Sequence, residues 1–390
     1  MADPLHGPTL YFVAGEPSGD RHAAAVLREL RGLDPSIRAL GVGGPLLKAA
    51  GQDQLFDLAA HAVVGLIEVL KNYFTFRRFF HQILADIALQ KPDAVVLVDY
   101  PGFNLRLARA LRARHPSLKL IYFISPQVWA WKAGRARLME ETLDLLLVLF
   151  PFELDWFKKH APSLPVICIG HPLLDRWRSE DKLPHDNQIF RIAILPGSRE
   201  PEIRAHLPIM LAAARELHPI APHATFHLLA ANDQCETLIR DGLARLGLGS
   251  PLFTVSTGYS LTQLSRSHLA WVASGTATIE CAVAGVPMLV LYKVNPITYW
   301  VGRQLVQVPY LAMVNILAGK KIVPEFLQHN ATPDALLATT KQLLNQPSLL
   351  RSMGNHLAQV VEKLGGPGAS RRAAIAIREA IHSNPNQPTQ

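Results

Sequence analysis

Five short loops in this chain each follow an apolar, strand-length run and precede a helix-like pattern. Such alternation predicts parallel sheets with crossover helices, and in open α/β sheets ligands bind in the loops at the carboxyl ends of the strands. Three loops fall in the first half of the chain and two in the second. We therefore predict two α/β layers facing each other across a cleft, which suits an enzyme that joins two substrates. The loops are GEPSGD (15–20), VDYPGFN (98–104), SPQVWAWK (125–132), LPGSR (195–199) and ASGTATIE (273–280).

The length of 390 residues is comfortable for two domains, each with its own core. The polar stretch 178–188 is the best linker candidate, and GGPGAS marks a break before a last helix at 371–382. We predict a first domain over 1–172, a second over 173–362, and a terminal part over 363–390 whose helix returns to the first domain before a polar tail. The expected strands are 10–14, 94–98, 120–124, 145–150, 166–169, 192–195, 225–230, 269–273 and 288–292.

Charge favours an anionic partner, because 39 Lys and Arg against 31 Asp and Glu give a net charge of +8. That partner could be a phosphorylated substrate, an acidic membrane surface or nucleic acid, and a basic surface without a particular partner explains the charge equally well. No basic block or stacking pattern of aromatics occurs, so we place nucleic acid last. Three cysteines without metal-like or redox-like spacing, no signal-peptide pattern and no membrane-length apolar run predict a soluble cytoplasmic protein.

The segment ASGTATIE is the sharpest local signal. Ser274, Gly275 and Thr276 follow a strand and open a helix, so helix-start amides and two hydroxyls could bind a diphosphate. Glu280 lies one turn further on, where its carboxylate could accept two ribose hydroxyls. The alternative is ordinary N-capping by Ser274 or Thr276, with Glu280 in solvent.

The segment LPGSR ends the preceding strand of the second half. Ser198 can cap a helix, and the Arg199 guanidinium could neutralise a departing diphosphate. Alternatively, Arg199 only pairs with Glu200 or Glu202. The sequence holds no DxD pair, P-loop or HExxH motif, so we expect no metal and no cofactor.

Two carboxylates in the first half are candidates for a general base. Asp99 ends the strand 94–98 and could either take a proton or cap the helix that starts near Asn104. Glu16, in GEPSGD, would repel a phosphate. We therefore interpret that loop as a site for sugar hydroxyls or for the acceptor.

The stretch 66–84 combines basic and aromatic residues on an amphipathic helix pattern. Such a helix suits a bilayer interface or an acyl-chain groove, although a wide core helix has the same pattern. The residues that we predict to contact membrane or acyl chains are Leu70, Tyr73, Phe74, Phe76, Arg77, Arg78, Phe79 and Phe80.

Taken together, these motifs resemble the lipid-A-disaccharide synthase family. Each motif alone is weak, but the ordered set is specific and spans roughly residues 9 to 380. Besides the loops above, it includes GVGGP (41–45), VVGLIEVLK (63–71), PFE (151–153), GHPLLD (170–175), VNILAGK (314–320) and VPEFLQ (323–328).

The resemblance implies an inverting glycosyltransferase with two Rossmann-like domains, the GT-B fold. Members join UDP-2,3-diacylglucosamine to 2,3-diacylglucosamine 1-phosphate (lipid X) through a β-1,6 link and release UDP. They act without a metal at the cytoplasmic face of the inner membrane of Gram-negative bacteria. A homodimer is compatible with this reading.

By the same resemblance, Asp99 is the base candidate and Glu16 and Ser18 belong to the loop facing the donor. Arg199, Ser274, Thr276, Glu280 and Asn315 line the UDP side. The chain departs from some members at Gly102, where they carry a second Asp, so this loop lacks the second carboxylate that a two-carboxylate mechanism would need there.

Two rival functions remain. A UDP-sugar epimerase of the same fold would share the SGT…E site but would have no use for the aromatic stretch at 66–84. A non-catalytic lipid-binding protein would use that stretch but not Arg199 and Glu280.

Overall fold

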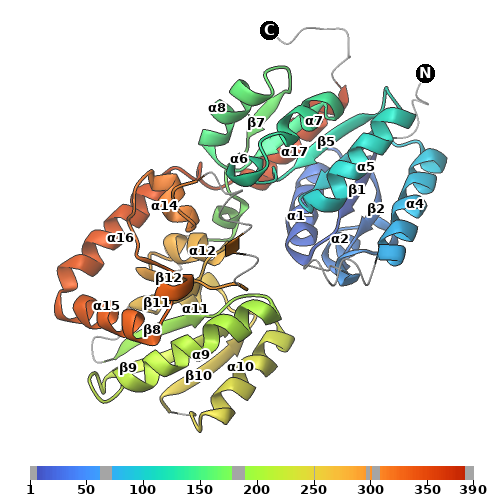
Figure 1. The fold of residues 1–390 in the computed structure, drawn as a ribbon. Coiled ribbons are helices and arrows are strands. Elements are labelled where there is room, and N and C mark those ends of the chain that lie inside the picture. The colour runs from blue at the N-terminus through green and yellow to red at the C-terminus, as the bar shows by residue number, and fades with distance from the viewer. Residues whose placement is uncertain are drawn as a thin grey trace. The chain divides into compact units, whose positions relative to one another are not determined.

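The computed structural model describes residues 7–61, 73–177, 189–249, 251–295, 299–300 and 308–382. The chain divides into two compact units (Figure 1). Met1–Asp175 and Leu364–Gln390 form the first, and Arg176–Lys363 the second. The linker candidate 178–188 and the tail 383–390 lie outside the described residues. None of the helices in the described ranges is long and apolar enough to cross a membrane.

The first unit contains a parallel sheet whose described strands have the order β3-β2-β1-β4-β5-β6-β7. The strands are β1 (Thr9–Ala14), β2 (Arg38–Gly43), β3 (Asp53–Asp57), β4 (Ala94–Val98), β5 (Lys119–Phe123), β6 (Leu145–Val148) and β7 (Val166–Cys168). The helices are α1 (Pro17–Leu33), α2 (Pro45–Ala49), α4 (Tyr73–Gln90), α5 (Pro101–Arg114), α6 (Val128–Trp131), α7 (Arg135–Thr142), α8 (Pro151–His160) and α17 (Ala369–His382), with 3₁₀ turns at Ala59–His61 and Pro172–Arg176.

Both faces of this sheet are buried because helices cover each of them. Successive side chains of a strand point to opposite faces. Tyr11 and Leu97 therefore join one hydrophobic cluster, with residues of α4 and α5. Phe12 and Val98 join the other, with residues of α1 and α17.

The terminal helix α17 returns to the first unit, as predicted, and packs against α1. Asp175 accepts hydrogen bonds from the amides of Gly368, Ala369 and Ser370 at 2.6 to 2.9 Å, which satisfies the exposed donors at the start of α17. The Nε of Arg372 donates to the carbonyl of Ile169 at 2.7 Å. These bonds hold the start of α17 against residues 169–175, where the first of the two chain segments of this unit ends.

The second unit contains another parallel sheet, with the described strands in the order β10-β9-β8-β11-β12-β13. The strands are β8 (Phe190–Leu195), β9 (Ala224–Ala230), β10 (Phe253–Thr257), β11 (Leu269–Ala273), β12 (Met288–Tyr292) and β13 (Glu325–Leu327). The helices are α9 (Glu200–Leu217), α10 (Asp233–Arg245), α11 (Leu261–Ser265), α12 (Ala277–Val283), α14 (Met313–Ala318), α15 (Pro333–Asn345) and α16 (Pro347–Glu362), with a 3₁₀ turn at Gln328–Asn330.

All nine predicted strands are present, with ends that differ by at most two residues. Sequence patterns missed β2, β3, β10 and β13. The last three lie at sheet edges and carry polar residues, while β2 contains two glycines, so none has the apolar run of a central strand.

Candidate active site

The carboxyl edge of the first sheet brings Glu16 and Asp99 to neighbouring strands. β1 and β4 pair with Ala14 opposite Val98, so the loops that hold these acids start side by side. Both residues are half-buried. Burial raises the pKa of Tyr122 well above its usual value, and the charges of Asp99 and Glu16 raise it further. The two carboxylates therefore act electrostatically on the same buried phenol.

The backbone of Asp99 and Tyr100 is left-handed, with φ values of 45° and 49°. Such a conformation costs a non-glycine residue about 1–3 kcal/mol and is often found at functional sites. The Asp99 carbonyl accepts hydrogen bonds from Asn104 Nδ2 at 2.8 Å and from the Tyr122 hydroxyl at 2.6 Å. Tyr100, not Asp99, is the N-cap of α5. The N-cap position that was the alternative interpretation for Asp99 is thus occupied by Tyr100, and the role of Asp99 as a base stays a prediction.

Tyr100 links the GEPSGD loop to Asp99. A Cβ placed on Gly15 would lie 2.3 Å from Tyr100 Cδ1, so only glycine fits against this ring. Burial and the charge of Glu16 raise the pKa of Tyr100 to about 12.

Ser18 is exposed in the first turn of α1. At Gly102 an added Cβ would meet no atom within 4 Å, so packing does not require glycine there.

A buried acid that sequence patterns did not single out is Glu153, in the PFE segment. It accepts hydrogen bonds from Trp129 Nε1 at 3.1 Å and from the amides of Leu149 and Phe150. Burial nevertheless raises its pKa to about 7. Glu153 thus ties the loop after β5 to the end of β6. An acid in the first turn of a helix after a strand was the available signal.

In the second unit, Arg199 lies at the start of α9 and is half-exposed. Its guanidinium pairs with Glu202 at 3.5 Å, as the alternative interpretation predicted. Glu202 also accepts a hydrogen bond from the amide of Ser198 at 3.0 Å. An ion pair this exposed contributes about 0–1 kcal/mol. Little free energy therefore opposes a move of the Arg199 guanidinium from Glu202 to a more highly charged anion.

His206 is hydrogen-bonded to the loop that carries Arg199, and sequence patterns did not point to it either. This fully buried imidazole bonds through Nδ1 to the Pro196 carbonyl at 2.9 Å and accepts through Nε2 from the Lys293 amide at 2.9 Å. Burial lowers its pKa, which favours the neutral form that this pair of bonds requires. His206 therefore ties the loop after β8 to the loop after β12.

The loop Ser274–Thr276 follows β11, the neighbour of β8 in the sheet. Gly275 and Thr276 are exposed, whereas the Ser274 hydroxyl donates to the Leu311 carbonyl at 3.2 Å. Thr276 is the N-cap of α12 but makes no side-chain capping bond. Neither hydroxyl therefore provides the ordinary N-cap that was the alternative interpretation.

Glu280, on α12, is half-buried and accepts a hydrogen bond from the hydroxyl of Tyr259. Tyr259 comes from the loop after β10, which the Ser260–Gln263 capping box fixes at the start of α11. No sequence pattern pointed to Tyr259, because the contact depends on the approach of α11 to α12.

Asn315 has an internal role in the structure. It is fully buried, donates to Val323 and Glu325, and accepts from the amides of Ile322 and Val323. Glu325 in turn accepts from the amides of Leu311 and Ala312. Since the amide group is occupied by protein partners, Asn315 orders this segment beside Ser274 and does not present a free group to a ligand.

The described part of the aromatic stretch begins at Tyr73 and belongs to α4. Residues 66–72, which include Leu70, and the side chain of Tyr73 lie outside the described residues. Phe79 is 5% exposed and belongs to the core, with Phe76 and Phe80 packed against it. Phe79 is thus a core residue, because one face of α4 covers the sheet, whereas Phe76 and Phe80 are only partly buried. For Phe76 and Phe80, contact with membrane or acyl chains stays a prediction. Phe74 is 78% exposed, and Arg77 and Arg78 are exposed.

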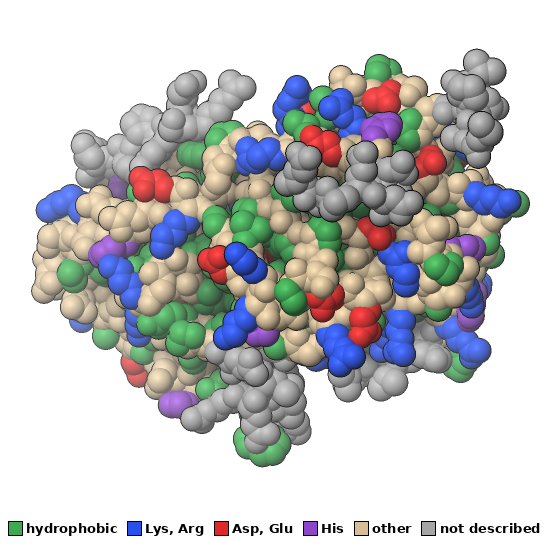
Figure 2. All heavy atoms as spheres, turned by 90° about the horizontal axis from the view of Figure 1, so that it is seen from above, with side chains coloured by type: hydrophobic (Ala, Val, Ile, Leu, Met, Phe, Trp, Pro, Cys, Tyr) green, Lys and Arg blue, Asp and Glu red, His purple; other side chains and the backbone are tan. Residues whose placement is uncertain are grey.

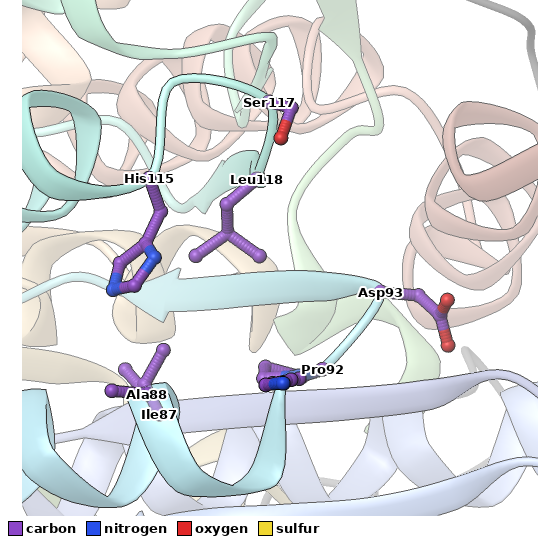
Figure 3. Close-up of a pocket in the computed structure, with 8 residues that line it drawn as sticks. Ile87, Ala88, Pro92, Asp93, His115, Ser117 and Leu118 are labelled. Carbon is purple, nitrogen blue, oxygen red and sulfur yellow. The ribbon is translucent and has the colours of Figure 1, made fainter.

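A hollow of about 380 Å³ lies in the first unit, at the amino ends of β4 and β5 (Figure 3). Pro92 and Asp93 precede β4, and Ser117 and Leu118 precede β5. Ligands of open α/β sheets bind at the opposite, carboxyl edge. We therefore do not assign this hollow to the active site.

Positive charge on one face of the molecule is scattered. Figure 2 shows Lys and Arg side chains distributed among acidic and apolar ones on that face. Among the described residues of that face, the basic side chains do not gather into one continuous patch, which is the usual footprint of nucleic-acid binding.

Comparison with solved structures supports the fold. The chain superimposes on a putative UDP-N-acetylglucosamine 2-epimerase from Listeria monocytogenes with a TM-score of 0.63 and 14% identity, covering 99% of this chain and 100% of that one. The MnaA–UDP co-structure of S. aureus gives 0.63 and 13%, covering 98% and 99%. The calicheamicin glycosyltransferase CalG4 gives 0.62 and 13%, covering 98% and 100%.

Sequence comparison identifies the family. A lipid-A-disaccharide synthase of Geobacter sulfurreducens is 37% identical over 381 residues, covering 95% of this chain and 97% of the relative. Lipid-A-disaccharide synthase 1 of Legionella pneumophila strain Paris is 37% identical over 367 residues, covering 92% and 94%. The family model described as lipid-A-disaccharide synthetase matches residues 10–380, so this chain belongs to the lipid-A-disaccharide synthase family of glycosyltransferases.

Proposed function

We propose that this enzyme transfers 2,3-diacylglucosamine from UDP-2,3-diacylglucosamine to 2,3-diacylglucosamine 1-phosphate, forming a β-1,6 link with inversion and releasing UDP. The observation that carries the proposal is the family match over residues 10–380, which spans both units and all the site loops.

The general test is UDP release with purified full-length protein. UDP should form only when both lipid substrates are present. An epimerase would convert the UDP-sugar in the absence of the acceptor. A lipid-binding protein would release no UDP, whether the UDP-sugar is supplied alone or together with the acceptor.

We place UDP in the second unit, along the loops after β8 and β11. The exposed Gly275 and Thr276 and the first amides of α12 would take the diphosphate, with Arg199 and Ser198 on the neighbouring loop. Glu280 would accept the ribose hydroxyls. Asn315 would not contact UDP itself. It would hold the segment beside Ser274 in place through its hydrogen bond to Glu325.

Glu280→Ala should weaken UDP binding by about tenfold or more, because a hydrogen bond to a charged group contributes about 1.5–3 kcal/mol. Isothermal titration of the full chain with UDP measures this. Glu216→Ala, which removes an exposed acid at the far end of α9, should leave the affinity unchanged. Equal affinities of Glu280→Ala and the unaltered protein would refute the ribose assignment.

We place the acceptor at the carboxyl edge of the first sheet, where Asp99 is the base. The half-buried Glu16 and the exposed Ser18 lie on the adjacent loop and would bind sugar hydroxyls. An inverting transfer needs one base and no enzyme nucleophile, so a single carboxylate suffices for the proton transfer.

We also propose that the enzyme binds the inner face of the inner membrane through α4. Phe74, Arg77 and Arg78 combine a large exposed apolar ring with two cations, a combination that favours an anionic interface. Leu70 and Tyr73, for which the sequence also predicts this contact, precede them in the chain.

Replacing both Arg77 and Arg78 with Gln should lower binding to vesicles containing phosphatidylglycerol by about tenfold or more, since each basic residue near such a surface contributes about 1 kcal/mol. Phe74→Ser should also reduce binding, through the loss of about 1.5–3 kcal/mol of apolar burial. Vesicle co-sedimentation measures both effects. The control is Leu89→Ser, at the other end of α4 and 77% exposed. Unchanged sedimentation of the Arg and Phe74 variants would exclude this surface.

A further inference from the structure

Asp99 and Tyr100 are two consecutive non-glycine residues in left-handed conformation. Neighbouring side chains must stabilise such a pair for it to persist. We propose that Tyr122 and Asn104 are positioning residues that hold Asp99 in the conformation needed for proton transfer, an inference that rests on the proposed role of Asp99 as the base.

Both side chains bind the same carbonyl oxygen, that of Asp99. Tyr122 lies on β5, next to β4, and its hydroxyl donates at 2.6 Å. Asn104 lies on α5, and its Nδ2 donates to this oxygen at 2.8 Å and to the Val98 carbonyl at 3.1 Å. A carbonyl oxygen has two lone pairs, so both are used.

These two bonds fix the peptide group between Asp99 and Tyr100. Its orientation sets ψ of Asp99 and φ of Tyr100, two of the four dihedral angles of the left-handed pair. The bond from Asn104 to the Val98 carbonyl holds the preceding peptide group, whose orientation sets φ of Asp99. Without both donors, the two residues would relax toward conformations that non-glycine residues prefer, and the carboxylate would turn away. Because burial raises the pKa of Tyr122, its hydroxyl remains a donor at neutral and moderately alkaline pH.

The chain offers a matched control in Tyr11. Tyr11 and Tyr122 are both fully buried in the same hydrophobic cluster, on strands that each pair with β4. The Tyr11 hydroxyl donates to Asp86 Oδ2 at 2.8 Å, on α4, and not to the Asp99 carbonyl. Tyr11→Phe therefore removes the hydrogen bond of another buried tyrosine hydroxyl, away from the Asp99 peptide.

The experiment compares Tyr122→Phe, Tyr11→Phe, Asp99→Asn and the double variant Tyr122→Phe/Asp99→Asn in the full chain. Tyr122→Phe should lower kcat by about tenfold with little change in KM for either substrate, since it disturbs the reacting group and not substrate binding. Tyr11→Phe should lower Tm about as much as Tyr122→Phe does, but it should leave kcat unchanged. Asn104→Ser, which removes the other donor, should lower kcat in the same direction as Tyr122→Phe.

Non-additivity is the decisive readout. If Tyr122 acts through Asp99, adding Tyr122→Phe to Asp99→Asn should not reduce the residual turnover further. Equal kcat values for Tyr122→Phe and Tyr11→Phe, or additive losses in the double variant, would overturn the positioning role. Near-normal turnover of Asp99→Asn alone would overturn the base assignment as well, whatever Tyr122→Phe does.

Discussion

Arg199→Ala should lower kcat by about 10²-fold or more, the scale expected for losing one group that stabilises developing charge. The negative charge on the leaving diphosphate grows during transfer, so a guanidinium beside it contributes more in the transition state than in the bound ground state. Arg199 is half-exposed beside the loop after β11, and its pair with Glu202 is weak enough to be exchanged. Steady-state kinetics with both lipid substrates measures the effect.

The same helix supplies a control. Arg204 pairs with Glu200 at 2.7 Å on the exposed surface of α9, so Arg204→Ala removes an exposed ion pair of the same helix while Arg199 is kept. Its kcat should stay within about twofold of normal, because such pairs contribute little. If Arg199→Ala changed only KM, Arg199 would bind substrate without stabilising the transition state.

Asp99→Asn should lower kcat by about 10²- to 10⁴-fold, the usual contribution of a general base. The substitution suits this position because Asn tolerates the left-handed conformation that Asp99 adopts, so the backbone should be preserved while the carboxylate is lost. The acidic limb of the kcat–pH profile should disappear together with the turnover.

Glu16→Gln and Asp155→Asn complete this test. Glu16 shares the edge of the sheet with Asp99, and its variant should retain the acidic limb. Asp155 is exposed on α8, and its variant should be fully active. If Asp99→Asn kept near-normal turnover and its acidic limb, Glu16 would become the base candidate.

In the aromatic stretch 66–84, local sequence patterns did not predict which residues are buried. Its spacing suited both a membrane helix and a core helix, and α4 has both kinds of residue. Phe79 packs into the core, whereas Phe74 is exposed. The sequence could not separate them, because the orientation of α4 depends on its contacts with the sheet and α5, which are distant in sequence.

Local sequence patterns were sufficient to predict the two α/β units, the central strands and the loops that carry Glu16, Asp99, Arg199 and Glu280. This was possible because apolar runs and helical spacing are local, and parallel topology places every carboxyl end on one edge of its sheet. Which polar groups meet at that edge depends on contacts between elements and could not be predicted from local patterns. Tyr122 reaches the Asp99 carbonyl through the pairing of β5 with β4, and Tyr259 reaches Glu280 through the packing of α11 on α12. Such contacts join residues about twenty positions apart, and their geometry depends on register and packing that no local pattern encodes.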